Sequence, residues 1–348
     1  MKPEPPRIEA GGPIRVLIAY SMMAPLRASF QALGSRFQIE FRTIEDRPGI
    51  DALDDPELEV LIASFPPRDR RRTPRLRWLQ LASAGVDHLI EEAPWSSGLT
   101  VTNARGVYGP SIGQYVLSEI LRINEHTDER RVLQLAHRWA DGALQEHLTG
   151  RLLRGQTAVV VGYGGVGREL ARLLDALGMR VIAVKNRPEV REDQSYHVPG
   201  TGDPTGVIPE RIVGLDELPA VIPLAGVVVL TIPLTTASRG LFNAGLIAAM
   251  RPDAWLVNIG RGPVADETAL ASALAGRRIG GAVLDVFGTE PLPPDSPFWD
   301  APNTVVTPHV SGGDASSPHI LADLLTENLR RYAAGEPLLN VVDPVRQY

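Results

Sequence analysis

The sequence contains no cysteine among its 348 residues. This excludes disulfide bonds, thiolate metal sites and a cysteine nucleophile, and it favours a cytoplasmic location. Lysine and arginine total 35 against 41 acidic residues, so the net charge of -6 offers no general attraction to nucleic acid or to an anionic membrane. We therefore expect neither as a partner, and we interpret the short basic run Arg68 to Arg72 as a solvated surface.

Long apolar runs are also missing, because no stretch approaches the ~18 residues that cross a bilayer. The start, Met1 to Gly12, is rich in proline and lacks the apolar core of a signal peptide, so no targeting segment is expected. Aromatic residues are few at 5%, whereas hydrophobic residues make up 44% and charged residues 22%, which is the balance of a globular protein. A chain of this length is expected to form two domains.

Short apolar runs alternate with helix-like segments, which is the pattern of parallel sheets covered by helices. Between two groups of strands, residues 111–137 predict one linking helix, and residues 318–333 predict a last helix that returns to the first domain. Residues 187–209 lack periodicity and predict a surface loop. The predicted strands are 14–20, 59–65, 76–82 and 99–103 in the first group and 157–161, 180–184, 227–232, 255–259, 281–286 and 304–307 in the second.

The strongest local motif is a glycine-rich turn between a buried strand and a helix. Gly162 permits a tight turn, Gly164 lets the backbone approach a pyrophosphate, and Gly167 lets the helix pack on the strand. The helix N-terminus adds partial positive charge. The motif predicts a dinucleotide site whose candidate contacts are Gly162, Gly164, Gly165, Val166 and Gly167.

The second strand of this domain ends in Lys185, Asn186 and Arg187. An acidic residue commonly stands here and accepts hydrogen bonds from the adenosine ribose. A carboxylate would repel a 2'-phosphate, whereas lysine and arginine pair with one, so these residues favour NADP over NAD. The alternative interpretation is that both cations are solvated loop residues.

Chemistry-bearing side chains follow several predicted strands at their carboxyl ends, where ligands gather in parallel sheets. His309 is the candidate proton donor, because imidazole exchanges protons near neutral pH. Glu290 would orient that imidazole and stabilise its charge, and the Arg261 guanidinium would bind a substrate carboxylate and carbonyl. Further candidate cofactor contacts at these strand ends are Ile232, Pro233, Ile259, Arg261, Asp285 and His309.

Taken in order, these motifs resemble the D-isomer-specific 2-hydroxyacid dehydrogenase family, which includes glyoxylate/hydroxypyruvate reductases and phosphoglycerate dehydrogenases. The resemblance covers nearly the whole chain. It is carried by the glycine turn and by residues 81–87, 101–103, 258–262, 266, 270, 284–287, 290–291 and 307–309.

The resemblance implies an α/β protein of two doubly wound domains. A Rossmann dinucleotide-binding domain, residues 121–315, would be inserted in a smaller flavodoxin-like substrate domain, residues 1–120 and 316–348. It implies a cleft that closes around the substrate and a homodimer with the helix near residues 112–137 at its interface.

The resemblance also implies roles for single residues. Arg261 would bind the substrate carboxylate and carbonyl, and Glu290 and His309 would exchange the proton. Asp285 would contact the nicotinamide carboxamide. Backbone amides around Ala84 and Gly85 would hold the substrate carboxylate, so the candidate substrate contacts are Ala84, Gly85, Arg261 and His309. The expected reaction is hydride transfer between NAD(P)H and a small 2-keto or 2-hydroxy acid of D configuration, with glyoxylate or hydroxypyruvate as the expected substrate.

One pair of neighbouring residues departs from the family pattern. Gly113 and Gln114 replace the common alanine and glutamate, which alters a structural hydrogen bond.

The histidine and acidic residues do not cluster at the spacing of metal ligands, so no metal is expected. The remaining histidines are interpreted as structural: His88, His126, His137, His147, His197 and His319.

Other functions fit the sequence less well. Formate dehydrogenases of the family carry glutamine where Glu290 stands, and phosphite dehydrogenases carry a lysine near Ala84 that is missing here. A nucleotide-sensing regulator of the corepressor type is the alternative from another class. Because a regulator tolerates loss of Arg261, Glu290 or His309, the intact set favours an enzyme.

Overall fold

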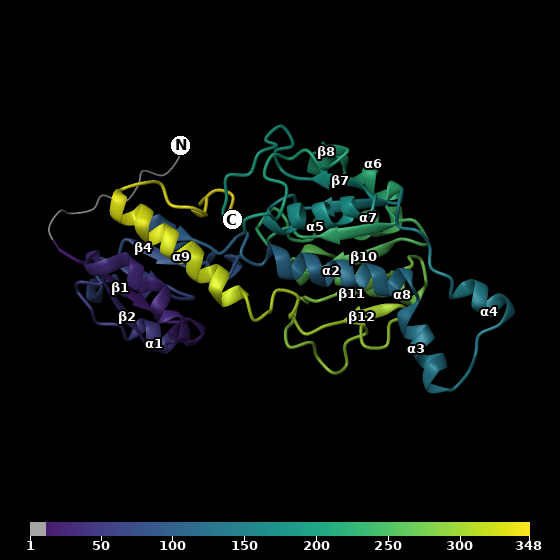
Figure 1. The fold of residues 1–348 in the computed structure, drawn as a ribbon, viewed down its shortest axis with the longest axis horizontal. Helices are drawn as coiled ribbons and strands as arrows, with labels where there is room; N and C mark the ends of the chain where they lie inside the picture. Colours follow the sequence, from purple (N-terminus) through teal and green to yellow (C-terminus); the bar gives the residue numbers. More distant parts are fainter. Residues whose placement is uncertain (1–11) are drawn as a thin grey trace. The chain divides into compact units, whose positions relative to one another are not determined.

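The computed structural model describes residues 12–348, so the proline-rich start that bears on targeting lies outside the described part except for Gly12. The chain divides into two compact units (Figure 1). Unit 1 contains the chain up to Tyr108 together with Gln194–Val198 and Asp314–Tyr348. Unit 2 contains Gly109–Asp193 and Pro199–Gly313. Among the described residues, no helix is long and apolar enough to cross a membrane.

The unit boundaries lie at residues 108 and 313, whereas the sequence predicted domain boundaries at residues 120 and 315. The first difference arises because helix α2 (Gly109–Asn124) packs along α5 (Gly165–Ala176) within unit 2. A Cβ atom added at Gly109 would lie 3.3 Å from the carbonyl oxygen of Gly165. The whole helix therefore follows the second sheet.

Gly113 lies in the same helix contact. A Cβ atom here would lie 3.0 Å from Cγ of Glu169 and 3.1 Å from Cδ1 of Leu173, so glycine allows the two helices to approach closely. Its neighbour Gln114 is exposed. Of the two residues that depart from the family pattern, Gly113 thus lies in a helix contact and Gln114 lies at the surface.

The five strands of unit 1 form a parallel sheet in the order β2-β1-β3-β4-β5. All four strands predicted for this unit are present, and β2 is additional. It lies at the edge of the sheet with its side chains mostly half-buried, so it lacks the continuous apolar run of the interior strands. The strands are β1 Ile14–Ile18, β2 Phe37–Phe41, β3 Val60–Ile62, β4 Trp78–Gln80 and β5 Thr100–Thr102.

Helices cover both faces of this sheet. On one face, the 3-10 segment η1 (Ser21–Arg36) and the last helix α9 (Ser317–Ala334) pack against Val16 and Ile18. Leu17, which alternates with these residues, faces the other core beside α1 (Arg47–Asp51). The last helix therefore lies in unit 1. The remaining short 3-10 turns of this unit are η2 Arg70–Arg72, η3 Asp87–Leu89 and η4 Pro94–Ser97.

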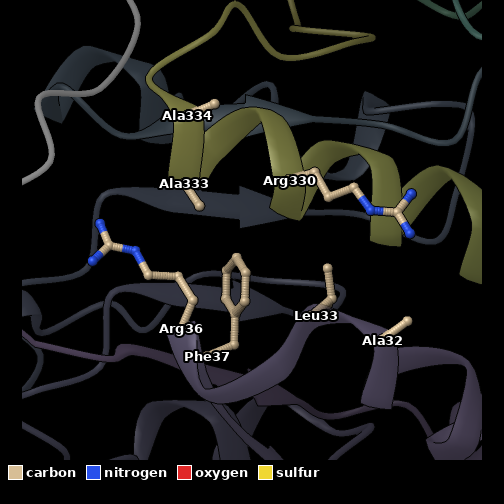
Figure 2. A pocket seen from close by; sticks show the side chains of 7 residues that line it. All are labelled: Ala32, Leu33, Arg36, Phe37, Arg330, Ala333 and Ala334. Atoms are coloured by element: carbon tan, nitrogen blue, oxygen red, sulfur yellow. The ribbon is translucent and has the colours of Figure 1, made fainter.

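A hollow of about 350 Å³ opens between η1 and α9 in unit 1 (Figure 2). Phe37 points toward α9, whereas Arg36 and Arg330 point away to either side. None of the predicted site residues contributes to its lining, which consists of Ala32, Leu33, Arg36, Phe37, Arg330, Ala333 and Ala334.

The seven strands of unit 2 form a second parallel sheet in the order β12-β11-β10-β9-β6-β7-β8. The six predicted strands are present, and β8 is an additional three-residue edge strand. The order reverses between β6 and β9, which is where a doubly wound sheet binds its ligand. The strands are β6 Thr157–Val161, β7 Arg180–Val184, β8 Arg211–Val213, β9 Val227–Leu230, β10 Trp255–Asn258, β11 Gly281–Leu284 and β12 Thr304–Val306.

Alternate residues of these strands enter two separate cores. Val159 and Leu230 face α7 (Ala244–Ala249) and α8 (Glu267–Ala275), whereas Val160 faces α2 and α5. Both faces are thus covered, as expected for a parallel sheet. The remaining short elements on the path between strands are η5 Leu215–Glu217, α6 Leu218–Val221, η6 Ile222–Leu224 and η7 Gly262–Val264.

The predicted linking helix over residues 111–137 is two helices in the structure. Helix α2 ends at Asn124, and α3 (Thr127–Leu135) begins after His126, whose φ of 50° is left-handed. A short helix, α4 (Gly142–His147), follows. No apolar residue stands between Ile123 and Val132, so the apolar periodicity ends where α2 ends, and the prediction of one helix extended past this signal. Figure 1 shows α3 and α4 beyond the end of the unit 2 sheet.

Candidate functional site

The candidate site lies along one edge of the unit 2 sheet. Because all seven strands are parallel, the segments that follow them meet at their carboxyl ends. Neighbouring strands β12, β11 and β10 lead into the segments that carry His309, Glu290 and Arg261. The topology thus brings these three predicted residues to one edge.

The glycine turn after β6 leaves room for a pyrophosphate. Gly162 has a φ of 109°, a backbone conformation that favours glycine. A Cβ atom at Gly167 would lie 2.0 Å from the carbonyl oxygen of Gly162, so only glycine allows α5 to pack this closely. Around Gly164, which precedes α5, a Cβ atom would have nothing within 4 Å. The turn is closed where helix meets strand and open at the helix N-terminus, and it therefore fits the phosphates of a dinucleotide.

The predicted contacts after β9 and β10 line the next part of the edge. The hydroxyl of Thr231 donates a hydrogen bond to the carbonyl oxygen of Gly162 at 2.6 Å, which joins the end of β9 to the glycine turn. A Cβ atom at Gly260 would lie 2.7 Å from the carbonyl oxygen of Ile232. Ile232 and Pro233 are half-buried and Ile259 is buried, so this segment offers an apolar wall.

The end of β7 carries the predicted selectivity residues. The Lys185 ammonium donates a hydrogen bond to the carbonyl oxygen of Val190 at 2.6 Å. Partial burial lowers the pKa of Lys185, and the nearby positive charge of Arg168 lowers it further. Asn186 and Arg187 are exposed. No carboxylate occupies these three positions, so nothing in them repels a 2'-phosphate.

The loop beyond this strand is not simply a surface loop, as the sequence predicted. Arg168 on α5 is only 2% exposed, and its guanidinium donates hydrogen bonds to the carbonyl oxygens of Asp203 and Arg191. It also lies 4.6 Å from the centre of the Tyr163 ring and 3.3 Å from the Asp193 carboxylate. One buried cation thus holds the loop from several sides.

Asp203 completes this anchor. Its carboxylate accepts a hydrogen bond from the Tyr163 hydroxyl at 2.6 Å and from the backbone amides of Val207 and Ile208. Burial alone would raise the pKa of Asp203, but these hydrogen bonds and the Arg168 charge outweigh it and hold the pKa below its ordinary value. Sequence analysis missed the anchor, because nothing in the local pattern marks Asp203 as buried.

His309 lies in a backbone segment that Asp285 organises. The Asp285 side chain is fully buried, and its carboxylate accepts hydrogen bonds from the Thr307 hydroxyl at 2.6 Å and from the amides of Val310 and Ser311. The His309 amide donates to the Asp285 carbonyl oxygen at 2.9 Å. These contacts hold His309 at a φ of 54°, which few non-glycine residues adopt.

Tyr115 extends this arrangement and was not singled out from the sequence. Its hydroxyl lies 2.7 Å from the Thr307 hydroxyl. Since the single proton of Thr307 is donated to Asp285, Tyr115 is the donor in this pair. Burial raises the pKa of Tyr115 to about 12, so the hydroxyl keeps its proton at neutral pH.

Glu290 and His309 form a direct pair. Nδ1 of His309 lies 2.8 Å from Oε2 of Glu290, and Oε1 of Glu290 accepts a hydrogen bond from the Phe287 amide at 2.8 Å. The side chains are 47% and 36% exposed, so the imidazole is fixed on one side and reachable on the other. Because Nδ1 is engaged by the carboxylate, Nε2 is the nitrogen available to a substrate.

Glu267 at the start of α8 adds a second carboxyl group nearby. It accepts a hydrogen bond from the Gly288 amide at 2.7 Å. Burial raises the pKa of Glu267, and the negative charge of Glu290 adds to the rise. Sequence analysis missed Glu267, because acidic residues are common in the first turn of a helix.

Arg261 follows β10 in an extended conformation. Its backbone carbonyl accepts a hydrogen bond from the Asn258 side chain at 3.1 Å, and its guanidinium donates to the Gly260 carbonyl at 2.9 Å. A Cβ atom at Gly262 would lie 2.0 Å from the backbone carbon of Phe287. This contact packs the Arg261 segment directly against the segment that leads to Glu290.

Ala84 and Gly85 belong to unit 1, in the loop after β4. The carbonyl of Ala84 accepts a hydrogen bond from the Asn103 side chain at 2.8 Å, and the carbonyl of Gly85 accepts one from the Ser83 hydroxyl at 2.8 Å. Within unit 1 the loop is therefore held through these two carbonyl oxygens.

Comparison with known proteins identifies the family. Residues 117–311 match the model of the D-isomer specific 2-hydroxyacid dehydrogenase NAD binding domain. The chain belongs to this family. The match spans the glycine turn and the segments of Arg261, Glu290 and His309, so this dehydrogenase is an oxidoreductase of 2-hydroxy acids with a nicotinamide dinucleotide as cofactor.

Individual relatives agree with this assignment. The chain is 34% identical over 262 residues to an (S)-sulfolactate dehydrogenase of Chromohalobacter salexigens, covering 75% of this chain and 78% of that protein. It is 31% identical to glyoxylate/hydroxypyruvate reductase B of Pectobacterium carotovorum, covering 87% and 92%. A crystal structure of a D-isomer specific 2-hydroxyacid dehydrogenase from Xanthobacter autotrophicus, in complex with NADPH and MES, superposes with a TM-score of 0.76 at 28% identity and covers 97% of this chain and 100% of that one. The predicted fold class and family are confirmed.

Proposed function

We propose that this dehydrogenase reduces a small 2-keto acid, glyoxylate or hydroxypyruvate in the first place, to the corresponding 2-hydroxy acid with NADPH, and that a chiral product has the D configuration. The observation that carries the proposal is the pair formed by His309 and Glu290, 2.8 Å apart and accessible from one side. A keto group needs both a hydride and a proton to become an alcohol, and this pair is built to supply the proton. The glyoxylate/hydroxypyruvate reductase among the relatives supports the substrate class.

The protein groups divide the work around the reacting carbonyl. A nicotinamide cofactor held at the glycine turn would supply the hydride. Nε2 of His309 donates a proton to the carbonyl oxygen, while Glu290 at Nδ1 stabilises the charged imidazole that precedes this transfer. Arg261 holds the substrate carboxylate and polarises the carbonyl. The backbone amides around Ala84 and Gly85 are further contacts for the carboxylate.

Asp285 has a role in addition to the carboxamide contact that the family resemblance implies. Both of its carboxylate oxygens accept hydrogen bonds from the segment 307–311. We infer that Asp285 sets the direction of the His309 ring, with Thr307 and Tyr115 as the next members of the same chain of hydrogen bonds.

NADPH is proposed as the preferred cofactor. Lys185, Asn186 and Arg187 present two cations and an amide, with no carboxylate, at the end of β7. The Xanthobacter autotrophicus relative was crystallised with NADPH. Cells keep their NADP pool reduced, and this also favours reduction as the physiological direction.

We further propose a homodimer, as the resemblance implies. Large apolar side chains are exposed on α3 and in the segments around α4, which is unusual for a surface in contact with water alone. Val132 is 64%, Leu135 66%, Trp139 88% and Leu152 84% exposed. Light scattering after size-exclusion chromatography should give twice the chain mass, and Trp139→Asp should shift the protein toward the monomer.

The first experiment follows the oxidation of NADPH and, separately, NADH with glyoxylate, hydroxypyruvate, pyruvate and bulkier 2-keto acids. Faster turnover with NADPH supports both the reaction and the cofactor preference, and the best substrate identifies the acid. Faster turnover with NADH contradicts the cofactor preference alone.

The same assay separates the alternatives. If no keto acid reacts while cofactor binding is measurable, formate and phosphite are tested as hydride donors to NADP. Turnover with either one would replace the proposed reaction. Cofactor binding without any turnover would favour the regulator, and the intact Arg261, Glu290 and His309 argue against this result.

A further inference from the structure

Two histidines and a glutamate meet between the start of α3 and the end of α4. Nδ1 of His126 lies 3.3 Å from one carboxylate oxygen of Glu129, and Nε2 of His147 lies 2.8 Å from the other. All three ligand atoms lie within 4.8 Å of one another. The sequence had suggested no such group, because His147 is separated from His126 by a whole helix and a loop.

Contacts around this cluster fix its shape. The Arg130 guanidinium on α3 donates to the carbonyl oxygen of Leu148 at 2.7 and 3.2 Å, which ties the end of α4 to α3. The side chain of Asn124 donates to the carbonyl oxygen of Arg151 at 2.7 Å, just beyond. The backbones that carry the three side chains are therefore held together by contacts that do not involve the cluster itself.

The donor set is that of a transition-metal site. Two imidazole nitrogens and one carboxylate are a common ligand set for zinc, whereas calcium and magnesium prefer oxygen ligands alone. A tetrahedral ion with bonds of about 2.1 Å keeps its ligands about 3.4 Å apart. The two imidazole nitrogens lie 3.3 and 2.8 Å from the two oxygens of Glu129, and the three ligand atoms lie within 4.8 Å of one another, so side-chain rotations would bring them around one ion.

The electrostatics also favour a cation between these groups. The two imidazole rings have their centres 4.8 Å apart on either side of a single carboxylate. Each oxygen of the Glu129 carboxylate faces one of the two rings. Protonating both rings would place two positive charges side by side, whereas one divalent ion satisfies two neutral rings and the carboxylate together.

We propose that Nδ1 of His126, the carboxylate of Glu129 and Nε2 of His147 bind one divalent transition-metal ion, Zn²⁺ in the first place. The ion fastens α4 to α3, and with it the connecting loop that carries the exposed Trp139. Three protein ligands leave a coordination position for water or for an external ligand. The site is separate from the His309 and Glu290 pair and does not depend on the proposed reaction.

The test is a calorimetric titration of the metal-free full-length protein with Zn²⁺, repeated with Co²⁺, whose visible absorption reports its coordination. One equivalent should bind, and the Co²⁺ spectrum should show tetrahedral rather than octahedral coordination. His147→Gln and Glu129→Gln each should weaken binding at least ~10-fold, as loss of a ligand does. The matched control is His137→Gln, a substitution of an exposed histidine in the same segment that should change nothing.

Absence of binding, or equal binding in the ligand variants and the wild type, would overturn the proposal. The wild-type protein provides a second check. Zn²⁺ should protect His126 and His147, but not His137, from modification by diethyl pyrocarbonate. Equal modification with and without the ion contradicts the site. Keto-acid turnover by Glu129→Gln should equal that of the wild type. Metal binding and turnover therefore test the metal site and the proposed reaction independently.

Discussion

The proposed proton donor depends on a backbone that a histidine rarely adopts. His309 is held at a φ of 54° because the Asp285 carboxylate and carbonyl engage the amides of residues 309–311. A left-handed conformation costs a non-glycine residue about 1 kcal/mol or more, so this conformation requires the surrounding hydrogen bonds. The site thus combines a reactive ring with a rigid support.

Replacing the ring tests its role directly. His309→Ala should lower keto-acid turnover by ~100-fold or more while the affinity for the cofactor stays nearly unchanged. The reason is that the proton donor is lost, whereas the glycine turn is untouched. Steady-state turnover and a fluorescence titration with NADPH measure the two quantities, and near-normal turnover would contradict the assignment.

Asp203 allows a test of the buried anchor through pH. Its pKa is lowered in the folded protein from an ordinary value of 3.8, so its ionised form stabilises the fold above that pH, and this contribution is lost as the pH falls through the lowered value. Asp203→Asn should therefore reduce the free energy of unfolding by about 1–3 kcal/mol at pH 7. The difference from the wild type should shrink below pH 3.8.

Urea unfolding of both proteins at pH 7 and again at pH 3 measures the difference. A penalty of the same size at both pH values would show that the ionised carboxylate is not what stabilises the loop. The conservative change Asp193→Asn serves as a comparison, because the Asp193 carboxylate is more exposed than Asp203 and should matter less.

Single residues were predictable to the extent that a local motif carried them. The glycine turn and the Thr307-Pro308-His309 segment stand out in the sequence because each follows a strand in a fixed pattern. Tyr115 could not be found in this way. It is 192 positions from Thr307, and only the packing of α2 against the sheet brings the two hydroxyls together.

Among the secondary-structure elements, α5 carries the proposed phosphate site at its N-terminus. It begins at Gly165 directly after the glycine turn, and it packs on β6 through Gly167. Its buried Arg168 also reaches the loop beyond β7. One helix therefore contacts both the glycine turn and the loop beyond β7.

Two alanine substitutions separate packing from binding in this turn. Gly167→Ala should destabilise unit 2 by about 1–3 kcal/mol, because its Cβ would lie 2.0 Å from a backbone oxygen. Gly164→Ala should leave stability unchanged, because its Cβ meets no protein atom within 4 Å, yet it should weaken NADPH binding by occupying the space near the helix N-terminus. Thermal unfolding and NADPH titration of both variants provide the measurement, and equal stability of the two would contradict the packing argument.

Most elements were predictable because interior strands of parallel sheets are apolar throughout. The two strands that sequence analysis missed, β2 and β8, both lie at sheet edges, where one side of each strand lacks a neighbour and polar residues are tolerated. The break between α2 and α3 was missed for another reason. The polar run over residues 124–131 already interrupts the apolar spacing, and the left-handed backbone of His126 lies within this run.

For the molecule as a whole, two units with separate cores should unfold separately. Leu325 of α9 is fully buried in the core of unit 1. Leu325→Ala should lower the free energy of unfolding of that unit by about 2–5 kcal/mol through the cavity it leaves. Calorimetry should show one transition at lower temperature and a second one unchanged, and NADPH should raise only the second. A parallel shift of all unfolding signals would contradict independent cores.

The amino-acid sequence alone determined the class of fold, the dinucleotide turn and the three residues proposed for the chemistry, because each depends on a periodicity or motif within a few neighbouring positions. Tertiary structure decided which side chains support them: Tyr115 behind Thr307, Asp203 beneath Arg168, and His147 opposite Glu129. These partners are far apart along the chain. Their contacts arise from the packing of whole helices and loops against the sheet, and side-chain packing of this kind leaves no periodic trace in the sequence.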